Sequence, residues 1–386
     1  MKKTWAVVVS LSALALLGAL SLAAPAPTAA AGGAKGKYTA TVYVAGHGGH
    51  FAKADVTIDP SDAEHPVKVA NLDMVNIGNT DSHKTHDARI DGTTLYWSTY
   101  ALDKEGKLHV GKSDMKTGKV IQDVAFAPDP RAPTTTPPAY CGSGQTKTAF
   151  MPVFMGNEGY VDVYEKKTLK LQHRVFVSDL GYKAGSYQFV HGTSSNDQKK
   201  FLVTVTLKGE DGKMNGKQDI LIVDLPALEK GKWKQLAKAT LTGEPGKTIA
   251  FRQYFGTGDK LVYQSAGDRM WVIDAKTLKL VDEKMTKPDF GENHDVEPTP
   301  DGKYALLTLR TADNVACDEK GNPTPDKKIT DGALQLYDAS AKKLVGKSVS
   351  VCFECHKGMG KGDKNAVLCG LASVFKGAPA TGSGGK

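Results

Sequence analysis

The chain has 386 residues, and its 50 Lys and Arg side chains against 42 Asp and Glu give a formal net charge of +8. The charges are interspersed, without a block of basic residues or a basic stretch interleaved with aromatic ones. The composition therefore argues against nucleic-acid binding. A chain of this length can bury a sizeable core in one large domain or two.

Residues 1–31 have the pattern of a secretory signal peptide. Lys2 and Lys3 precede an uncharged apolar run at 5–24, and the alanines at 29–31 offer a small-residue cleavage site. The run is near the length that spans a bilayer, so an uncleaved anchor is the alternative. With cleavage, we expect a periplasmic or secreted protein without stable membrane insertion.

Short strand patterns then recur along the chain. The clearest units, "YVDVYEKKTLKLQ" (160–172) and "MWVIDAKTLKLV" (270–281), each combine an apolar strand, an acidic residue that opens a turn, and a second strand. A period near fifty with four short strands per unit is typical of β-propeller blades, which stack to bury their faces and close into a ring. The acidic residues of the units are Asp59, Asp114, Glu165, Asp224, Asp274 and Asp338.

The repeat predicts an all-β fold, a β-propeller of seven blades with four antiparallel strands each, over residues 37–345. Six acidic residues are visible, and a seventh blade is expected where residues 37–45 pair with strands from the C-terminal end. Six or eight blades are the neighbouring alternatives, and a pair of β-sandwiches is the other architecture. After the propeller we expect a haem-attachment segment at 346–376 and a disordered tail at 377–386.

Two turn-rich segments interrupt the repeat, and each carries a cysteine. Residues 126–144 are rich in Pro and Thr and contain Cys141, and the polar residues 311–332 contain Cys317. Export permits disulfides, so Cys141 and Cys317 are a candidate pair, with Cys369 as the competing partner. The chain has five cysteines, and this odd number leaves at least one outside an internal disulfide.

A Cys-x-x-Cys-His motif follows the last blade at residues 352–356. This is the attachment pattern of c-type haem: Cys352 and Cys355 reach the two vinyl groups, and His356 lies under the macrocycle as the proximal iron ligand. Haem attachment follows export, which the signal peptide supplies independently. A Cys352–Cys355 disulfide and a zinc site that adds Cys369 and a histidine are the alternatives.

The motif and the blade units together resemble a propeller-type c-type cytochrome. The blades, over residues 38–345, are similar to bacterial YVTN-type, amine-dehydrogenase-like and nitrous-oxide-reductase-like propellers. The resemblance implies one covalent haem c. Only about forty residues follow the last blade, too few for the helices of a compact cytochrome c domain. We therefore expect the haem to pack against the propeller.

Four histidines stand where inner strands of blades should begin. Inner strands ring the central channel of a propeller, so residues at their starts should face one mouth of it. Imidazoles gathered there suit copper, zinc or iron, either as the distal haem ligand or around a second metal. Nitrous-oxide-reductase-like propellers hold copper with histidines from several blades. The four candidates are His83, His86, His191 and His294.

Other polar residues of the same strands provide an alternative to metal binding at the mouth. They would form a polar funnel for an anion or a small substrate. These residues are Arg89, Arg252, Asp295 and Glu297.

Three functions fit these patterns. The preferred one is an exported mono-haem cytochrome that transfers electrons to or from other redox proteins, because it needs only the haem motif and a docking surface. The second is a redox enzyme with a substrate or copper-like site in the channel. The third is a haem-free binding propeller with a Cys352–Cys355 disulfide.

Haem stacking between subunits would also permit oligomerisation. The hydrolase motifs G-x-S-x-G and H-E-x-x-H are absent from the sequence.

Overall fold

The computed structural model describes most of the chain. The predicted signal peptide, Cys352, Cys355, His356 and the tail at 377–386 lie outside the described residues. No helix among those described is long and apolar enough to cross a membrane. The described ranges are 36–45, 49–79, 82–132, 139–156, 158–317, 323–351 and 370–376, with the backbone alone for 311–317, 323–332 and 350.

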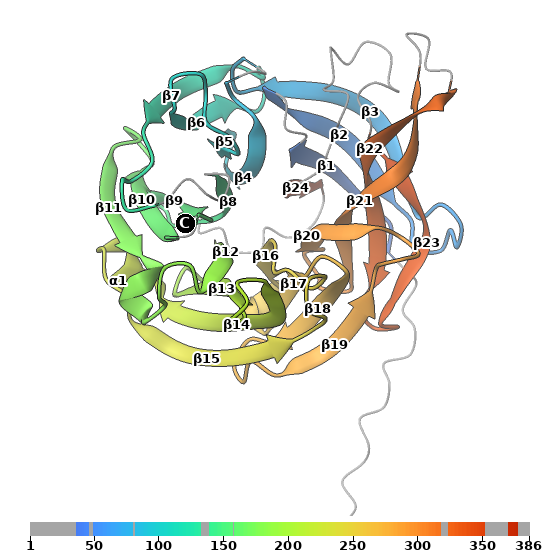
Figure 1. Ribbon diagram of the computed structural model, residues 1–386. Coiled ribbons are helices and arrows are strands. Elements are labelled where there is room, and N and C mark those ends of the chain that lie inside the picture. Colours follow the sequence, from blue (N-terminus) through green and yellow to red (C-terminus); the bar gives the residue numbers. More distant parts are fainter. Residues whose placement is uncertain are drawn as a thin grey trace, which may run out of the picture. The chain divides into compact units, whose positions relative to one another are not determined.

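The described strands form six four-stranded antiparallel sheets, arranged as blades around a central axis (Figure 1). From the axis outward, blade 1 contains β24 (Leu371–Lys376), β1 (Tyr38–Ala45), β2 (His50–Ile58) and β3 (Val67–Asn76). Blade 2 contains β4 (Thr85–Asp91), β5 (Thr94–Thr99), β6 (Leu108–Asp114) and β7 (Val120–Phe126). Blade 3 contains β8 (Tyr140–Gln145), β9 (Ala149–Phe154), β10 (Tyr160–Glu165) and β11 (Leu171–Phe176).

The remaining three blades follow in chain order. Blade 4 contains β12 (Tyr187–Ser194), β13 (Lys200–Lys208), β14 (Met214–Asp224) and β15 (Gln235–Thr242). Blade 5 contains β16 (Gln253–Phe255), β17 (Leu261–Ser265), β18 (Arg269–Asp274) and β19 (Leu280–Met285). Blade 6 contains β20 (Glu292–Pro298), β21 (Tyr304–Cys317), β22 (Pro323–Asp338) and β23 (Lys343–Ser350). The helices described between strands are η1 (Val177–Leu180), α1 (Leu225–Glu229) and η2 (Thr257–Asp259).

The predicted propeller is confirmed, but the prediction of seven blades is wrong. Each of the six acidic residues of the repeat stands at or directly after the end of the third strand of one blade, so they mark the six blades once each. Residues 37–45 do pair with the C-terminal end, since Tyr43 lies opposite Ala372 in the β1–β24 pair. This pairing adds no blade, because β24 supplies the missing inner strand to the sheet that already contains β1, β2 and β3.

The acidic residues hold the turns into the outer strands by accepting backbone hydrogen bonds. Oδ1 of Asp274 accepts the N–H of Thr277 at 2.7 Å and its hydroxyl at 2.8 Å. Asp114 makes the same pair of contacts with Thr117, at 2.6 and 2.8 Å. Side chains that cap their own turn in this way act locally, which explains why the repeat is visible in the sequence.

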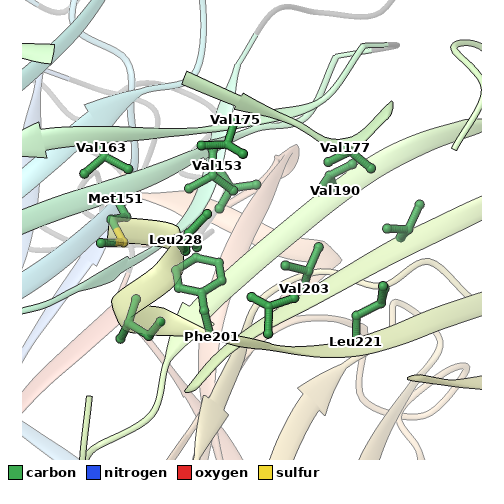
Figure 2. Close-up of a cluster of buried hydrophobic side chains, with 14 of the residues drawn as sticks. Met151, Val153, Val163, Val175, Val177, Val190, Phe201, Val203, Leu221 and Leu228 are labelled. Atoms are coloured by element: carbon green, nitrogen blue, oxygen red, sulfur yellow. The ribbon is translucent and has the colours of Figure 1, made fainter. Parts of the chain in front are cut away.

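Apolar side chains fill the space between adjacent blades. Figure 2 shows one such layer, in which Met151, Val153 and Val163 of blade 3 face Phe201 and Val203 of blade 4. The inner and middle strands are therefore buried on both faces, whereas the outermost strand β15 alternates between exposed and half-buried positions. The hydrophobic effect thus drives the stacking of blades, since no blade can bury both faces alone.

Both predicted interruptions of the repeat contain strands. The segment at 126–144 includes the start of β8, where Cys141 is buried, and 311–332 carries the extended ends of β21 and β22. Cys141 is the only cysteine whose side chain is described, so its predicted pairing with Cys317 or Cys369 lies outside the described side chains. β24 lies within the stretch 346–376 that we expected to attach haem.

Candidate functional site

The six inner strands begin at the same end of the axis, and each strand, or the segment just before it, contributes one residue to a buried group. We call this group the axial cluster. Its members, in chain order, are His86, Cys141, His191, Phe251, His294 and Gly370. Phe251 lies two residues before β16, and Gly370 lies directly before β24.

Cys141 lies between two of the predicted histidines. Its Sγ is 2.7 Å from Nε2 of His191 and 3.6 Å from Nε2 of His86. The other ring nitrogen of His86, Nδ1, is 2.5 Å from the carbonyl oxygen of Tyr140. Because a carbonyl oxygen only accepts, Nδ1 of His86 carries a proton, and the opposite ring nitrogen, Nε2, faces the sulfur. All three side chains have further interactions besides these.

His294 occupies the opposite side of the axial cluster, and Phe251 separates it from Cys141. The imidazole of His294 stacks on Phe251 at 3.9 Å between centroids, and Phe251 meets His191 edge-on at 6.0 Å. Nε2 of His294 is 3.2 Å from Oε1 of Glu292. Both ring nitrogens of His294 are buried, and neither makes a hydrogen bond of good geometry with the described residues, so the contact of Nε2 with Glu292 is an ion-pair distance only.

Glu292 keeps a negative charge beside His294. Burial alone would raise the pKa of this carboxyl, but the interaction with His294 and the charges of Arg310 and Lys287 lower it to about 2. The distances are 3.3 Å to Arg310 Nη1 and 3.1 Å to Lys287 Nζ. His294 is therefore oriented by an ionised carboxylate on one side and an aromatic ring on its face.

Aromatic rings line the rest of the axial cluster. Tyr100 meets His86 at 4.4 Å between centroids, and Phe189 lies 6.4 Å from His191 and 6.2 Å from Phe251. Imidazole and thiol groups thus stand in a largely buried setting with aromatic neighbours. Groups of this kind can bind a flat aromatic molecule or a soft metal ion.

A layer of charged side chains crosses the axis next to the axial cluster. Arg252 donates from Nε to Oδ1 of Asp87 at 3.1 Å, and Arg89 donates from Nε to the carbonyl of Ser143 at 2.8 Å. Asp295 accepts the backbone N–H of Leu371 at 2.7 Å. Burial raises the pKa of Asp295 to about 7, although Arg252, the Leu371 N–H and Arg89 all favour its ionised form.

A cavity of about 450 Å³ lies at the other end of the inner strands. Glu297 lies in its wall and accepts the hydroxyl of Ser373 at 2.6 Å and its backbone N–H at 3.2 Å. Burial raises the pKa of Glu297. Arg89 of the charged layer also lines this cavity, so the layer divides the axis into a histidine-rich end and a separate cavity of mixed polar and apolar lining.

The structure brings together three of the four predicted histidines, His86, His191 and His294, and places His83 elsewhere, in blade 2. The predicted polar residues Arg89, Arg252, Asp295 and Glu297 line the axis, as described above. The haem-motif residues Cys352, Cys355 and His356 lie outside the described residues. Sequence reasoning missed Cys141 and Phe251 as members of the cluster. Cys141 could have been found from its spacing, because it follows His86 by 55 residues and precedes His191 by 50.

Three solved structures were found to be similar to this chain. A chain in the nidogen/laminin complex matches with a TM-score of 0.50 and 8% identity, over 88% of this chain and 98% of that one. Hydrazine synthase of Kuenenia stuttgartiensis matches with a TM-score of 0.45 and 16% identity, over 72% and 69% of the two chains. A protein of unknown function from Bacteroides caccae matches at 0.49 and 10%, over 87% and 99%.

These similarities concern the fold alone, because all three identities are low, and the two TM-scores below 0.5 carry no further argument. No protein-family model and no curated protein matches the sequence.

Proposed function

We propose that the protein is an exported mono-haem c-type cytochrome that exchanges electrons with other redox proteins and uses the propeller to cover its haem. In this proposal Cys352 and Cys355 attach the haem, and His356 is the proximal ligand of the iron. The bound haem would supply one-electron transfer. The described residues contribute a buried, partly aromatic setting and a candidate for the second axial ligand.

The observation that carries the proposal is the position of Gly370. It is the first described residue after the predicted attachment motif, fourteen residues beyond His356. A Cβ on Gly370 would lie 2.6 Å from the carbonyl oxygen of His86, so the chain enters β24 in direct contact with the axial cluster. The motif is thereby tethered by a short length of chain to the end of the axis where the histidines gather.

The side chains of the axial cluster are of the kinds that surround a haem. Its imidazoles offer axial nitrogens, and the rings of Tyr100, Phe189 and Phe251 can pack on the faces or edges of an aromatic macrocycle. Among the histidines, we propose His294 as the distal ligand, because its buried Nδ1 lacks a hydrogen-bond partner among the described residues. Glu292 would then orient the ring through Nε2.

The first experiment tests covalent attachment. The full chain is expressed in an export-competent host with c-type haem maturation machinery, and reduced-minus-oxidised spectra are recorded before and after denaturation. We expect one covalent haem per chain in the wild type and none in a Cys352→Ser/Cys355→Ser variant. Cys141→Ser, outside the motif, should keep its covalent haem. A wild-type protein that matures without covalent haem would contradict the proposal.

The second experiment tests the distal ligand. His294→Ala should shift the Soret and α bands and change the reduction potential, because the iron loses an axial nitrogen. His65→Ala is the matched control, since the side chain of His65 is 57% exposed and does not belong to the axial cluster. If His294→Ala leaves both the spectrum and the potential unchanged, His294 is not the distal ligand, whatever the outcome for covalent attachment.

A redox enzyme with a second metal in the axial cluster is the other candidate function. It is favoured by Cys141, whose sulfur faces Nε2 of both His86 and His191, because thiolate and imidazole ligands suit copper and zinc. Element analysis of the purified holoprotein separates the candidates. Iron without copper favours simple electron transfer, whereas copper that is lost in Cys141→Ser favours the enzyme.

A further inference from the structure

A second group of histidines and carboxylates lies in blade 2, away from the axis. His109 is in β6 and Asp123 is in the neighbouring outer strand β7, where Asp123 pairs with Gly111, two residues from His109. His83 comes from the segment that leads into β4, and Asp103 comes from the turn between β5 and β6. We call these four residues the blade-2 cluster. None of them belongs to the axial cluster.

Three side chains of the blade-2 cluster converge on one point. Nε2 of His83 is 2.8 Å from Oδ2 of Asp123, and Nδ1 of His109 is 3.0 Å from Oδ1 of the same carboxylate. The two imidazole rings are 4.1 Å apart between centroids and tilted by 48°. One ligand atom from each of the three side chains lies within 4.8 Å of the other two.

This spacing is close to what a bound zinc ion requires. A tetrahedral ion with ligands about 2.0–2.1 Å away holds those ligand atoms roughly 3.3 Å from one another. The nitrogen–oxygen distances of 2.8 and 3.0 Å would therefore need to open by only a few tenths of an ångström. The carboxyl of Asp123 is 31% exposed, which leaves an entry path and room for a water ligand.

The second nitrogen of each histidine is held by a partner of the kind that metal-binding histidines have. Nε2 of His109 is 3.1 Å from Oδ2 of Asp103, whose other oxygen accepts the N–H groups of Glu105 and Lys107. Nδ1 of His83 is 2.8 Å from the hydroxyl of Ser82. These contacts fix both rings with the remaining nitrogen directed at Asp123.

The charges of the cluster are also those of a cation site. Among the described residues, the ion pairs of Asp103 and Asp123 are made with the two histidines, and no Lys or Arg side chain pairs with either carboxylate. The histidines are largely buried, with side chains 11% and 8% exposed. The cluster thus presents two imidazoles and two carboxylates to one another without a Lys or Arg partner, a set of donor atoms that a divalent ion can join.

We propose that His83, His109 and Asp123 bind a divalent transition-metal ion of the zinc type, with Asp103 and Ser82 as positioning residues and water in the open position. Two imidazoles and one carboxylate suit borderline metals such as zinc, rather than the oxygen-only sites of calcium or magnesium. The site is independent of the haem and of the axial cluster.

The test uses the full-length holoprotein after chelator treatment and dialysis, which leave a covalent haem in place. Zn²⁺ is titrated by calorimetry, and Co²⁺ is added as a spectroscopic probe. We expect a site of one equivalent in the wild type that is lost in Asp123→Asn and His109→Ala. Asp103→Asn should bind 10–100-fold more weakly while keeping the stoichiometry. The exposed His65 again serves as control, and His65→Ala should bind like the wild type.

Two further measurements show whether the bound ion occupies this site or another one. Cys141→Ser should retain the bound equivalent, because its sulfur belongs to the axial cluster. Zn²⁺ should raise the Tm of the wild type but not that of Asp123→Asn, whose near-isosteric change allows folding to be checked by circular dichroism without metal. Saturable binding that persists in folded Asp123→Asn and His109→Ala, or no saturable binding by the wild type at millimolar Zn²⁺, would overturn the proposal.

Discussion

At the scale of single residues, the inner strands carry ionisable groups in a buried setting. Asp87, Asp295 and Glu297 face the side chains of Arg89 and Arg252, and all five are buried or nearly so. Burying a charge is costly unless it is paired and hydrogen-bonded. Arg252 is paired with Asp87, whereas the oxygens of Asp295 accept only backbone N–H groups in the described contacts.

Asp295 should make the stability of the protein depend on pH. Its folded pKa of about 7 lies above the value of about 3.8 expected for the unfolded chain. A raised carboxyl pKa favours the folded state when the group is protonated, so its contribution is fully present below pH 4 and is lost as the pH rises to 7. Integrated over this window, the loss amounts to about 4 kcal/mol as an upper bound.

Asp295→Asn should not show this loss. The difference in the free energy of unfolding between the variant and the wild type should therefore shift in favour of the variant by up to about 4 kcal/mol from pH 4 to pH 7. Urea denaturation at several pH values measures the difference. Glu292→Gln should behave in the opposite sense, because the pKa of Glu292 is lowered to about 2 and its contribution is lost as the pH falls below 4. Parallel profiles for the wild type and Asp295→Asn would refute the first expectation.

At the scale of elements, the six-residue strand β24 makes several contacts that hold the propeller together. It pairs with β1 to complete blade 1, and its first residue, Leu371, is buried. It also donates backbone N–H groups from Leu371 and Ser373 to Asp295 and Glu297. This strand thus closes the ring, satisfies two buried carboxyl groups and connects the predicted haem motif to the axial cluster.

A chain truncated after Gly370 should therefore be severely destabilised. The truncation exposes the inner edge of blade 1 and removes the donors that β24 supplies to the buried carboxyl groups of Asp295 and Glu297, each lost hydrogen bond at a cost of about 1–3 kcal/mol. A chain truncated after Lys376 keeps β24 and is the matched control. Thermal unfolding followed by circular dichroism should show a strongly lowered or missing transition for the first truncation only. Equal Tm values for both truncations would show that β24 is dispensable.

At the scale of the whole propeller, the two ends of the axis have different chemistry. One end gathers His86, His191, His294 and Cys141, and the other opens into the cavity of about 450 Å³ beside Glu297. The buried charged layer separates them. Ring closure by the two ends of the described chain (Figure 1) places the approach to β24 at the histidine end, which is why the haem motif and the histidines can act at one site in the proposed function.

Much of the fold could be read from the sequence, because the signals involved are local. The acidic turn residues accept hydrogen bonds from groups two or three positions away, as at Asp274. Each blade therefore carries the same local sequence pattern. The number of blades equals the number of these acidic residues, and counting one further blade for the segment that closes the ring gave the wrong number. Residues 37–45 pair with the strand before Asp59, and only the pairing between the two ends of the chain shows that β24 completes this same sheet and does not start a seventh.

The candidate site divides in the same way. The sequence by itself placed histidines in or next to the inner strands of several blades and a Cys-x-x-Cys-His motif after the repeat. Only the tertiary structure decided which of them meet. His83 and His86 are three residues apart, yet His86 faces Cys141 on the axis and His83 faces Asp123 in blade 2. Local hydrogen bonds determine a turn, but the partners of a side chain on an inner strand come from neighbouring blades about fifty residues away, and packing alone selects them.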